Sequence, residues 1–446
     1  MVDPGPALPR RLGRRSVLAG LVGAAGATAL AGCGNGSGGS GKSGSATLNV
    51  WGGVPAESGP DDLIAAFHKA HPDITVKYTR YVNDDEGNLK LDNSLQGGVP
   101  IDLFFSYNIG NLSKRVNAGL TLDLTDKVKD ESAFSKFGVD ADPQGNYVFD
   151  KKIYSVPAAL SPELVLVNAD ALDKAGVEVP DNWDVDDYHR VAKALSKSNV
   201  YGSLGSPNLA RTKLGPNYRY TPDGKASNFG NPAFREQLEL ALAMQKDGSA
   251  IPQKTVLSQK LQTFSQASFL SGRHRMMITQ AYMLRYVSDT KEYPHDFKVR
   301  CLPVPAPVKG QEYWNEGAYG DLLSISQKSE QQDAAWEFLK FWVNEAGTYM
   351  VKGGRLPSLL DNSQADKMLD ALLGSDKQKL YDVDSFKPVL FDEKMKIPVD
   401  TIYTAADEID TIVEKLDDQV LLGDITVDQW VSQATSQANS AIKKSA

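Results

Sequence analysis

Two histidines and two carboxylate pairs have the residue types and the spacing that chemistry needs. His68 and His71 would share one face of a helix, and imidazoles in such an arrangement can bind a metal ion. His71 stands directly before Pro72, where the predicted helix ends, and no third ligand is near. The sequence therefore predicts no metal site.

The carboxylate pairs Asp61-Asp62 and Asp417-Asp418 could act as the acid and the base of a glycoside hydrolase. Both pairs are typical of solvated charges on helices. Neither Ser203 nor Ser206 has the flanking glycines of a G-x-S-x-G elbow, and the sequence contains no H-E-x-x-H motif and no cysteine cluster. We expect no enzymatic activity and no cofactor, and a hydrolase stays open as an alternative.

One phosphate-binding motif is matched by its letters alone. Residues 36–43 fit G-x-x-x-x-G-K-S, but a phosphate loop needs a strand before it and a helix after it. This segment leads instead into the strand-like residues Ala46 to Trp51. The match therefore predicts no nucleotide site.

The amino terminus has the layout of a secretory signal. Arg14-Arg15 stands before the uncharged stretch Ser16 to Gly32, which is too weakly apolar to span a membrane stably. The segment ends in Leu30-Ala31-Gly32-Cys33, which resembles the lipobox of bacterial lipoproteins. The resemblance implies that residues 1–32 are removed and that Cys33 carries a lipid. The arginine pair resembles a twin-arginine signal, and ordinary secretion stays open.

Residues 33–45 follow as a lipidated cysteine and a Gly/Ser tether. Such a composition is flexible and spans on the order of 20 Å. Without residues 1–32 the chain has 44 basic and 55 acidic residues, a balance that argues against nucleic-acid binding. The only other cysteine, Cys301, has no disulfide partner and is expected to be buried.

The remaining 414 residues are long enough for two domains, and their patterning indicates α/β layers. Strands are expected at 46–51, 74–78, 101–105 and 164–167. Helices are expected from Asp61 to Pro72, at 111–118, after 167 up to Gly176, and at 232–246, 258–270, 331–344, 399–421 and 426–443. We expect mostly parallel sheets.

The order of short motifs along the chain carries a family resemblance. The motifs are Leu48 to Gly53, Leu63 to Ile74, Pro100 to Phe104, Lys152 to Pro157, Val167 to Leu172, Ala175 to Val177, Trp183, Phe269 to Arg273, Met276 to Ile278, Leu323 to Ser326 and Ala334 to Leu339. Together they resemble the extracellular solute-binding proteins of ABC importers, in the carbohydrate-binding branch related to maltose-binding protein. The resemblance covers nearly the whole chain after the tether.

The resemblance implies a two-lobed fold of the periplasmic-binding-protein type, with a ligand held in the cleft between two α/β lobes. Lobe 1 would comprise residues 46–156 plus about 306–370, and lobe 2 residues 157–305 plus about 371–446. Hinges are expected near Val156-Pro157 and Leu302 to Pro307, with a third return between Gln364 and Asp384. The protein would be a monomer, lipid-anchored on the extracellular side of the cytoplasmic membrane, and would deliver a carbohydrate to the permease of an ABC importer.

Sugar sites combine flat aromatic rings with carboxylates, amides and guanidinium groups, and the resemblance places them in loops after strands. The predicted ligand-binding residues are Trp51, Ser106, Tyr107, Asn108, Ser161, Glu163, Tyr282, Trp314, Asn315, Glu316 and Arg355.

Several of these residues have a structural alternative. Trp51 could be a core residue, residues 106–108 could cap a helix, and Tyr282 could pack on one. Glu163 could be solvated, and Arg355 could pair with a carboxylate. A ligand other than a sugar, such as a polyamine, a peptide or a phosphodiester, stays open as well.

Overall fold

The computed structural model describes residues 45–142, 144–261 and 265–445. The predicted signal, the lipidation site Cys33 and residues 34–44 of the tether lie outside the described residues. Among the residues that are described, no helix has both the length and the apolar run needed to cross a bilayer.

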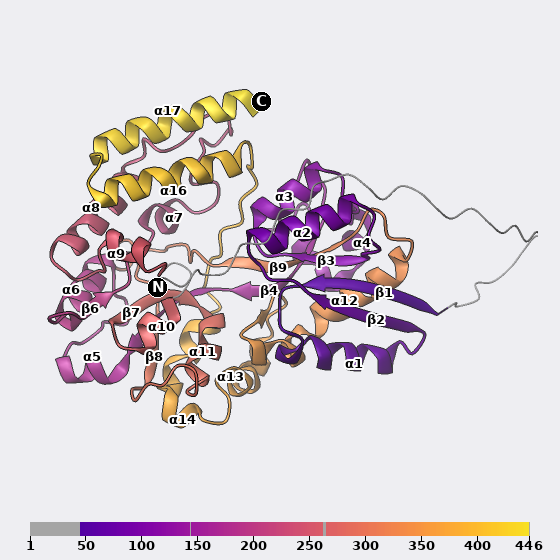
Figure 1. Ribbon diagram of the computed structural model, residues 1–446, viewed down its shortest axis with the longest axis horizontal. Coiled ribbons are helices and arrows are strands. Elements are labelled where there is room, and N and C mark those ends of the chain that lie inside the picture. Colours follow the sequence, from indigo (N-terminus) through magenta and orange to yellow (C-terminus); the bar gives the residue numbers. More distant parts are fainter. Residues whose placement is uncertain (1–44, 143, 262–264, 446) are drawn as a thin grey trace, which may run out of the picture. The chain divides into compact units, whose positions relative to one another are not determined.

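Two sheets organise the described chain (Figure 1). The first has six strands in the order β10-β4-β9-β3-β1-β2. Its strands are β1 (Ala46–Gly52), β2 (Ile74–Arg80), β3 (Leu103–Ser106), β4 (Val156–Ser161), β9 (Ala318–Ile325) and β10 (Leu356–Pro357). The second has the order β6-β7-β5-β8, formed by β5 (Glu163–Asn168), β6 (Tyr201–Ser203), β7 (His274–Gln280) and β8 (Val299–Pro303).

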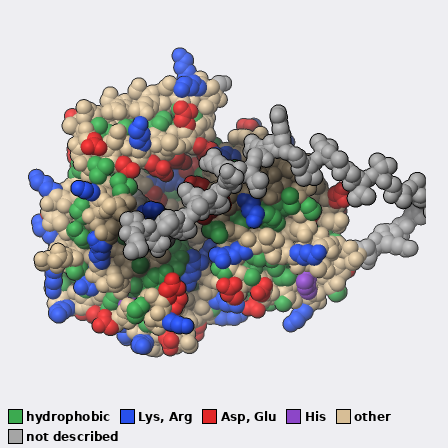
Figure 2. Space-filling view, in the orientation of Figure 1, with side chains coloured by type: hydrophobic (Ala, Val, Ile, Leu, Met, Phe, Trp, Pro, Cys, Tyr) green, Lys and Arg blue, Asp and Glu red, His purple; other side chains and the backbone are tan. Residues whose placement is uncertain are grey.

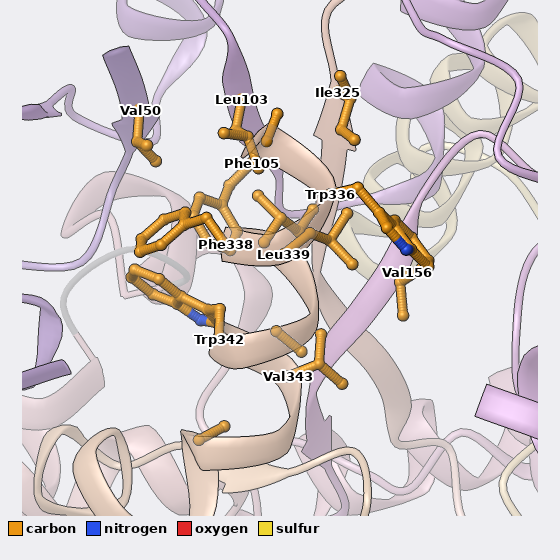
Figure 3. Close-up of a cluster of buried hydrophobic side chains, with 14 of the residues drawn as sticks. Val50, Leu103, Phe105, Val156, Ile325, Trp336, Phe338, Leu339, Trp342 and Val343 are labelled. Carbon is orange, nitrogen blue, oxygen red and sulfur yellow. The ribbon is translucent and has the colours of Figure 1, made fainter. Parts of the chain in front are cut away.

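Helices cover both faces of the first sheet. They are α1 (Pro60–Ala70), α2 (Asp85–Gln96), α3 (Ile109–Asn117), α4 (Thr125–Asp130) and α12 (Gln332–Tyr349), with the 3-10 turns η1 (Ala56–Ser58), η2 (Ser132–Phe137) and η4 (Val351–Gly353). Leu103 and Phe105 pack with α12, whereas Phe104 between them packs with α2, as strand alternation requires. Figure 3 shows Leu103 and Phe105 beside the α12 side chains.

Helices also cover both faces of the second sheet. The remaining helices and turns are α5 (Ala169–Ala175), α6 (Val185–Leu195), α7 (Leu209–Leu214), α8 (Pro232–Lys246), α9 (Gln253–Ser258), α10 (Ser265–Leu270), η3 (Ala281–Met283), α11 (Leu284–Ser288), η5 (Asn362–Gln364), α13 (Ala365–Leu373), α14 (Lys377–Leu380), η6 (Val383–Ser385), α15 (Lys387–Leu390), α16 (Ala406–Leu422) and α17 (Val427–Ser445). Of these, α7, α16 and α17 pack with α8 in a cluster that contains no strand residue. Val165 and Val167 pack with α5 and α6, and Leu164 and Leu166 pack with α11 and α13. The two-lobed α/β fold expected from the sequence is confirmed.

The expectation of mostly parallel sheets is wrong. The pairs β1-β2, β1-β3 and β6-β7 are parallel, and the other five pairs are antiparallel. In the first sheet β4 and β9 each run against both of their neighbours, and in the second sheet β5 does. Strands β9 and β5 each enter their sheet from the other lobe and not through a helix packed on that sheet, so no parallel crossover fixes their direction.

Two of the expected long helices are wrong in extent. In place of one helix over 258–270, α9 ends at Ser258 and α10 begins at Ser265. The helix expected from Val399 begins at Ala406, because the preceding segment is held extended: the Asn217 side chain accepts hydrogen bonds from the Thr401 and Ile402 amides at 2.8 and 3.0 Å.

The chain changes sheet at Pro162, between β4 and β5, and returns between β8 and β9. Val156-Pro157 lies inside β4, and Leu302-Pro303 inside β8. The lobe limits given above stay a prediction.

Candidate functional site

Asn315 fastens the two segments that join the lobes. Its side-chain oxygen accepts hydrogen bonds from the amides of Glu163 and Gly317, each at 2.8 Å, and its Nδ2 donates to the Glu163 carbonyl at 2.8 Å. Gly317 allows this close approach, since a Cβ there would lie 2.5 Å from the Ser161 carbonyl oxygen. Asn315 therefore fixes the backbone on which Glu163 and Glu316 stand.

We call Glu163 and Glu316 the acidic pair. The Asn208 amide donates to Glu316 Oε1 at 2.6 Å. Burial, the largest cause, raises the pKa of Glu316 to about 7, although Asn208 and two arginines oppose the shift. Burial and the charge of Glu316 raise the pKa of Glu163 well above its usual value. The pair therefore holds a proton near neutral pH.

Two arginines stand close to the acidic pair, and each is bound to another carboxylate. Arg211 Nη1 donates to Asp400 Oδ1 at 2.7 Å, and Arg219 Nη1 donates to Asp410. Both guanidinium groups also lie over the Tyr218 ring, 5.0 and 5.3 Å from its centroid. Figure 2 shows acidic and basic side chains in the hollow below α16.

Trp314 lies beside these groups. Its amide donates to the Thr212 carbonyl at 3.0 Å, and its indole packs on Gly215, where an added Cβ would lie 2.3 Å from Nε1. The ring is half-buried. The structure thus brings the predicted residues 314–316 together with Glu163.

A second group, which we call the aromatic group, consists of Tyr78, Tyr81 and Tyr107 with the Asp321–Arg355 ion pair. The Tyr107 hydroxyl accepts a hydrogen bond from the Gly53 amide at 2.6 Å, and its ring stacks on Phe105. Arg355 Nε donates to Asp321 Oδ2 at 3.2 Å. Asp321 has a φ of 48°, which is unusual within a strand and indicates local strain.

Tyr282 is an exposed residue among those predicted, and it lies against the loop that contains Arg355. Its ring is 37% exposed, and a Cβ at Gly354 would lie 2.8 Å from its Cα. Gly354 has a φ of 81°, a conformation that glycine adopts without strain. The backbone of residues 353–355 therefore lies directly against the base of Tyr282.

Trp51 packs in one cluster with Tyr81 and Tyr107 of the aromatic group, on the α2 side of the first sheet, and Lys90 Nζ lies 5.9 Å from its ring centroid. Three other predicted residues do not join either group through their side chains. Ser106 is buried and accepts from Arg115, and Asn108 caps α3 by accepting from the Asn111 amide. Ser161 is half-buried at the end of β4, next to the crossing.

Sequence reasoning missed residues that the fold brings to these groups. They are Tyr78, Tyr81, Asn208, Arg211, Tyr218, Arg219 and Asp321. Asn208 to Arg211 had a local signal, because Asn208 stands at the start of a short helix and caps it. Nothing in the local sequence predicts the contacts of the others, since Arg219 binds Asp410 at a separation of 191 residues, Asp321 binds Arg355 at 34, and Tyr81 binds the Phe105 carbonyl at 24.

The two histidines and Asp417 have structural roles. His68 Nε2 accepts a hydrogen bond from the Val76 amide at 2.9 Å, and His71 stacks on Phe67. Asp417 was expected to be solvated, which is wrong: it accepts from the Trp430 indole at 2.8 Å, and burial raises its pKa to about 6. Within the described ranges, no cluster of three His, Cys, Asp or Glu side chains could hold a metal ion.

A pocket of about 760 Å³ lies beside α2, and Tyr81 of the aromatic group lines part of it. Val82, Leu89 and Val99 line it together with charged side chains, and none of the predicted residues does. Because titratable groups with shifted pKa values and stacking aromatics gather at the lobe junction instead, the candidate site is placed there.

Residues 53–349 match the model of the bacterial extracellular solute-binding protein family. The chain belongs to this family. A curated relative, an uncharacterised lipoprotein encoded in the 5′ region of oleD of Streptomyces antibioticus, is 24% identical over 298 residues. The alignment spans 63% of this chain and only 62% of the relative.

Solved structures share the fold of this family member. An ABC substrate-binding protein from Listeria monocytogenes, in complex with cycloalternan, has a TM-score of 0.69 at 20% identity and covers 89% of this chain and 99% of its own. The GacH receptor of Streptomyces glaucescens, solved unliganded and with acarbose, has a TM-score of 0.67 at 19% identity, with 90% and 100% covered. A sugar transporter from Rhizobium etli in an open conformation has a TM-score of 0.67 at 20% identity, with 88% and 98% covered.

Proposed function

We propose that this solute-binding protein captures a sugar or oligosaccharide between its two lobes and delivers it to the permease of an ABC importer. One observation carries the proposal: the lobe junction gathers exposed or half-buried aromatic rings with hydrogen-bonding carboxylates, the combination that sugars need. Trp314 and Tyr282 supply apolar faces, and Glu163 and Glu316 supply acceptors for hydroxyl groups.

The comparisons support this ligand class. The solved structures of similar fold include proteins in complex with cycloalternan, with acarbose and with tagatose. In the proposed mechanism a ligand contacts both lobes and so favours the closed arrangement, since it binds that arrangement better. The bending would occur in the two crossing segments, on either side of the contact through which Asn315 and Gly317 fasten them.

The predicted lipid on Cys33 and the Gly/Ser tether would hold the protein on the extracellular side of the cytoplasmic membrane. The family relationship and the lipoprotein relative support this location. A monomer on a flexible tether could reorient to reach the permease. Lobe 1 would comprise residues 46–156 and about 306–370, and lobe 2 residues 157–305 and about 371–446. The binding residues would be Glu163, Trp314, Asn315 and Glu316 at the junction, together with Tyr107 and Arg355.

A thermal-shift screen of mono- and oligosaccharides, amino acids, peptides and polyamines tests the proposal. A sugar at 100 times its Kd should add about 2.7 kcal/mol to the free energy of unfolding. A melt that peptides or polyamines raise, and no sugar does, would contradict the sugar assignment. Incubation of the same oligosaccharides with the protein should give no hydrolysis products, whereas turnover would identify a hydrolase.

A further inference from the structure

The charges around the acidic pair do not balance. Two guanidinium groups, Arg211 and Arg219, stand among four carboxylates, and their close hydrogen bonds go to Asp400 and Asp410. Arg211 Nη2 is also engaged, since it donates to the Pro398 carbonyl at 3.1 Å. The acidic pair is therefore left with an excess of negative charge.

Glu163 has the less satisfied carboxylate of the two. Among the described residues, none donates a hydrogen bond to its side-chain oxygens, and its charged neighbour there is another acid, Glu316. Glu163 is half-buried, so part of the residue stays accessible from outside the protein. The Glu163 carboxylate therefore faces space that a ligand can occupy.

Hydrogen bonds fix the positions of both residues of the acidic pair. Asn315 binds the amide and the carbonyl of Glu163 with two hydrogen bonds of 2.8 Å, which fixes the first residue of β5. Asn208 fixes Glu316 from the other side at 2.6 Å. A held carboxylate that is desolvated and has no cation is costly unless a partner arrives.

We infer that the ligand is an amino sugar, whose protonated amino group binds between Glu163 and Glu316. The inference rests on the proposed sugar-binding function and names the class of sugar. An ammonium group donates up to three charge-assisted hydrogen bonds, so it satisfies both carboxylates where a neutral hydroxyl satisfies one acceptor at a time. Trp314, packed beside the pair, offers an apolar face for the sugar ring.

The ammonium group would displace the proton that the pair holds in the free protein. Burial raises the pKa of both carboxylates, and Arg211, Arg219, Asp400, Asp410 and Tyr218 are the charged or titratable groups around them. Binding of the cation at pH 6.5 therefore releases a proton to the solvent. A neutral sugar leaves that proton in place.

Isothermal titration of the full chain tests the inference with matched probes. Glucose is compared with 2-amino-, 3-amino- and 6-amino-deoxyglucose, and cellobiose with the β-1,4 glucosamine dimer, at pH 6.5 in phosphate and in a buffer of high ionisation enthalpy. At least one amino form should bind tenfold or more tightly than its neutral counterpart, and its apparent enthalpy should differ between the buffers by the proton released.

The variant Glu163→Gln keeps the shape of the side chain and should bring the amino and neutral forms to within about twofold of each other, with no proton release. Glu312→Gln, which changes an exposed acid nearby, should keep the preference. Retained binding of a neutral sugar, with an unchanged melting curve, shows that Glu163→Gln is folded; if it is not, Glu316→Gln is used for the same comparison.

The outcomes separate the inference from the proposed function. Neutral sugars that bind as tightly as or more tightly than their amino forms overturn the inference and leave the sugar function standing. A preference that survives in both Gln variants also overturns it. If no sugar of either kind binds, the proposed function falls and the inference with it. If spermidine binds and no sugar does, the cleft is a polyamine site.

Discussion

The buried carboxylate of Glu316 predicts a pH-dependent stability. Burial raises its pKa to about 7, whereas the unfolded chain loses this proton near pH 4.5. The folded state therefore binds the proton more tightly, and the free energy of unfolding should fall as the pH rises from about 4.5 to 7. Glu316→Gln should remove about 1 to 3 kcal/mol of this fall, as measured by urea denaturation at pH 5 and pH 8.

Glu57, an exposed residue of η1, provides the control for that measurement. Glu57→Gln should follow the wild-type dependence on pH. If Glu316→Gln also follows it, the carboxylate is not desolvated in the way the structure indicates.

The Asp321–Arg355 ion pair gives a second prediction about individual residues. The two side chains are 10% and 18% exposed, so removal of one partner leaves a charge with little access to water. Arg355→Met should lower the free energy of unfolding by about 3 kcal/mol. Adding Asp321→Asn should restore at least half of the loss in urea denaturation, since asparagine also tolerates the positive φ of 48°. No recovery in the double variant would contradict a pairing role.

Residue types alone predicted only part of the candidate site. The run Trp314-Asn315-Glu316 stood out in the sequence as an aromatic and polar loop, and the structure does bring it to Glu163. The role of Asn315 as a backbone clamp had no local signal, because its partner Glu163 is 152 residues away. Whether these residues bind a ligand stays a prediction.

At the level of secondary-structure elements, the close packing of the two segments that cross between the lobes gives a prediction about stability. A Cβ on Gly317 would lie 2.5 Å from the Ser161 carbonyl oxygen and 2.6 Å from the Pro162 Cα. Because backbone atoms cannot move aside as a side chain can, Gly317→Ala should lower the free energy of unfolding by about 1 to 3 kcal/mol and weaken ligand binding.

Gly230 is the matched glycine for this test, since nothing lies within 4 Å of a Cβ added there and its backbone conformation suits any residue. Gly230→Ala should leave thermal unfolding within about 0.5 kcal/mol of the wild type. Equal effects of the two substitutions would mean that the crossing segments can separate freely.

Periodic elements were predicted well where the signals were local. Helix α8 has the bounds that the sequence indicates, and α5 ends at Ala175 and is capped by Gly176, whose φ of 62° suits glycine. Residues 399–405 were misread as helix, because their conformation is set by hydrogen bonds to Arg211 of α7 and to Asn217 in the loop after it, both distant in sequence. Tertiary contacts override local preference there.

At the scale of the whole molecule, the two cysteines give a prediction about location. If Cys33 carries the lipid, the full chain expressed in bacteria should enter the detergent phase on phase partition, and Cys33→Ser should move it to the aqueous phase. Cys301 is buried, so Cys301→Ser should leave the partition unchanged. Retention of Cys33→Ser in the detergent phase would contradict the anchor.

The sequence by itself determined the α/β class, most of the periodic elements and, through the order of its motifs, the family. These follow from local patterning, which needs no knowledge of distant partners. The tertiary structure decided which strands run parallel or antiparallel, where the chain changes lobe, and which partners each charged side chain has. Glu163 shows the reason. Its pKa is raised because the fold buries the carboxylate and places Glu316 beside it, while Arg211 and Arg219 bind Asp400 and Asp410 instead.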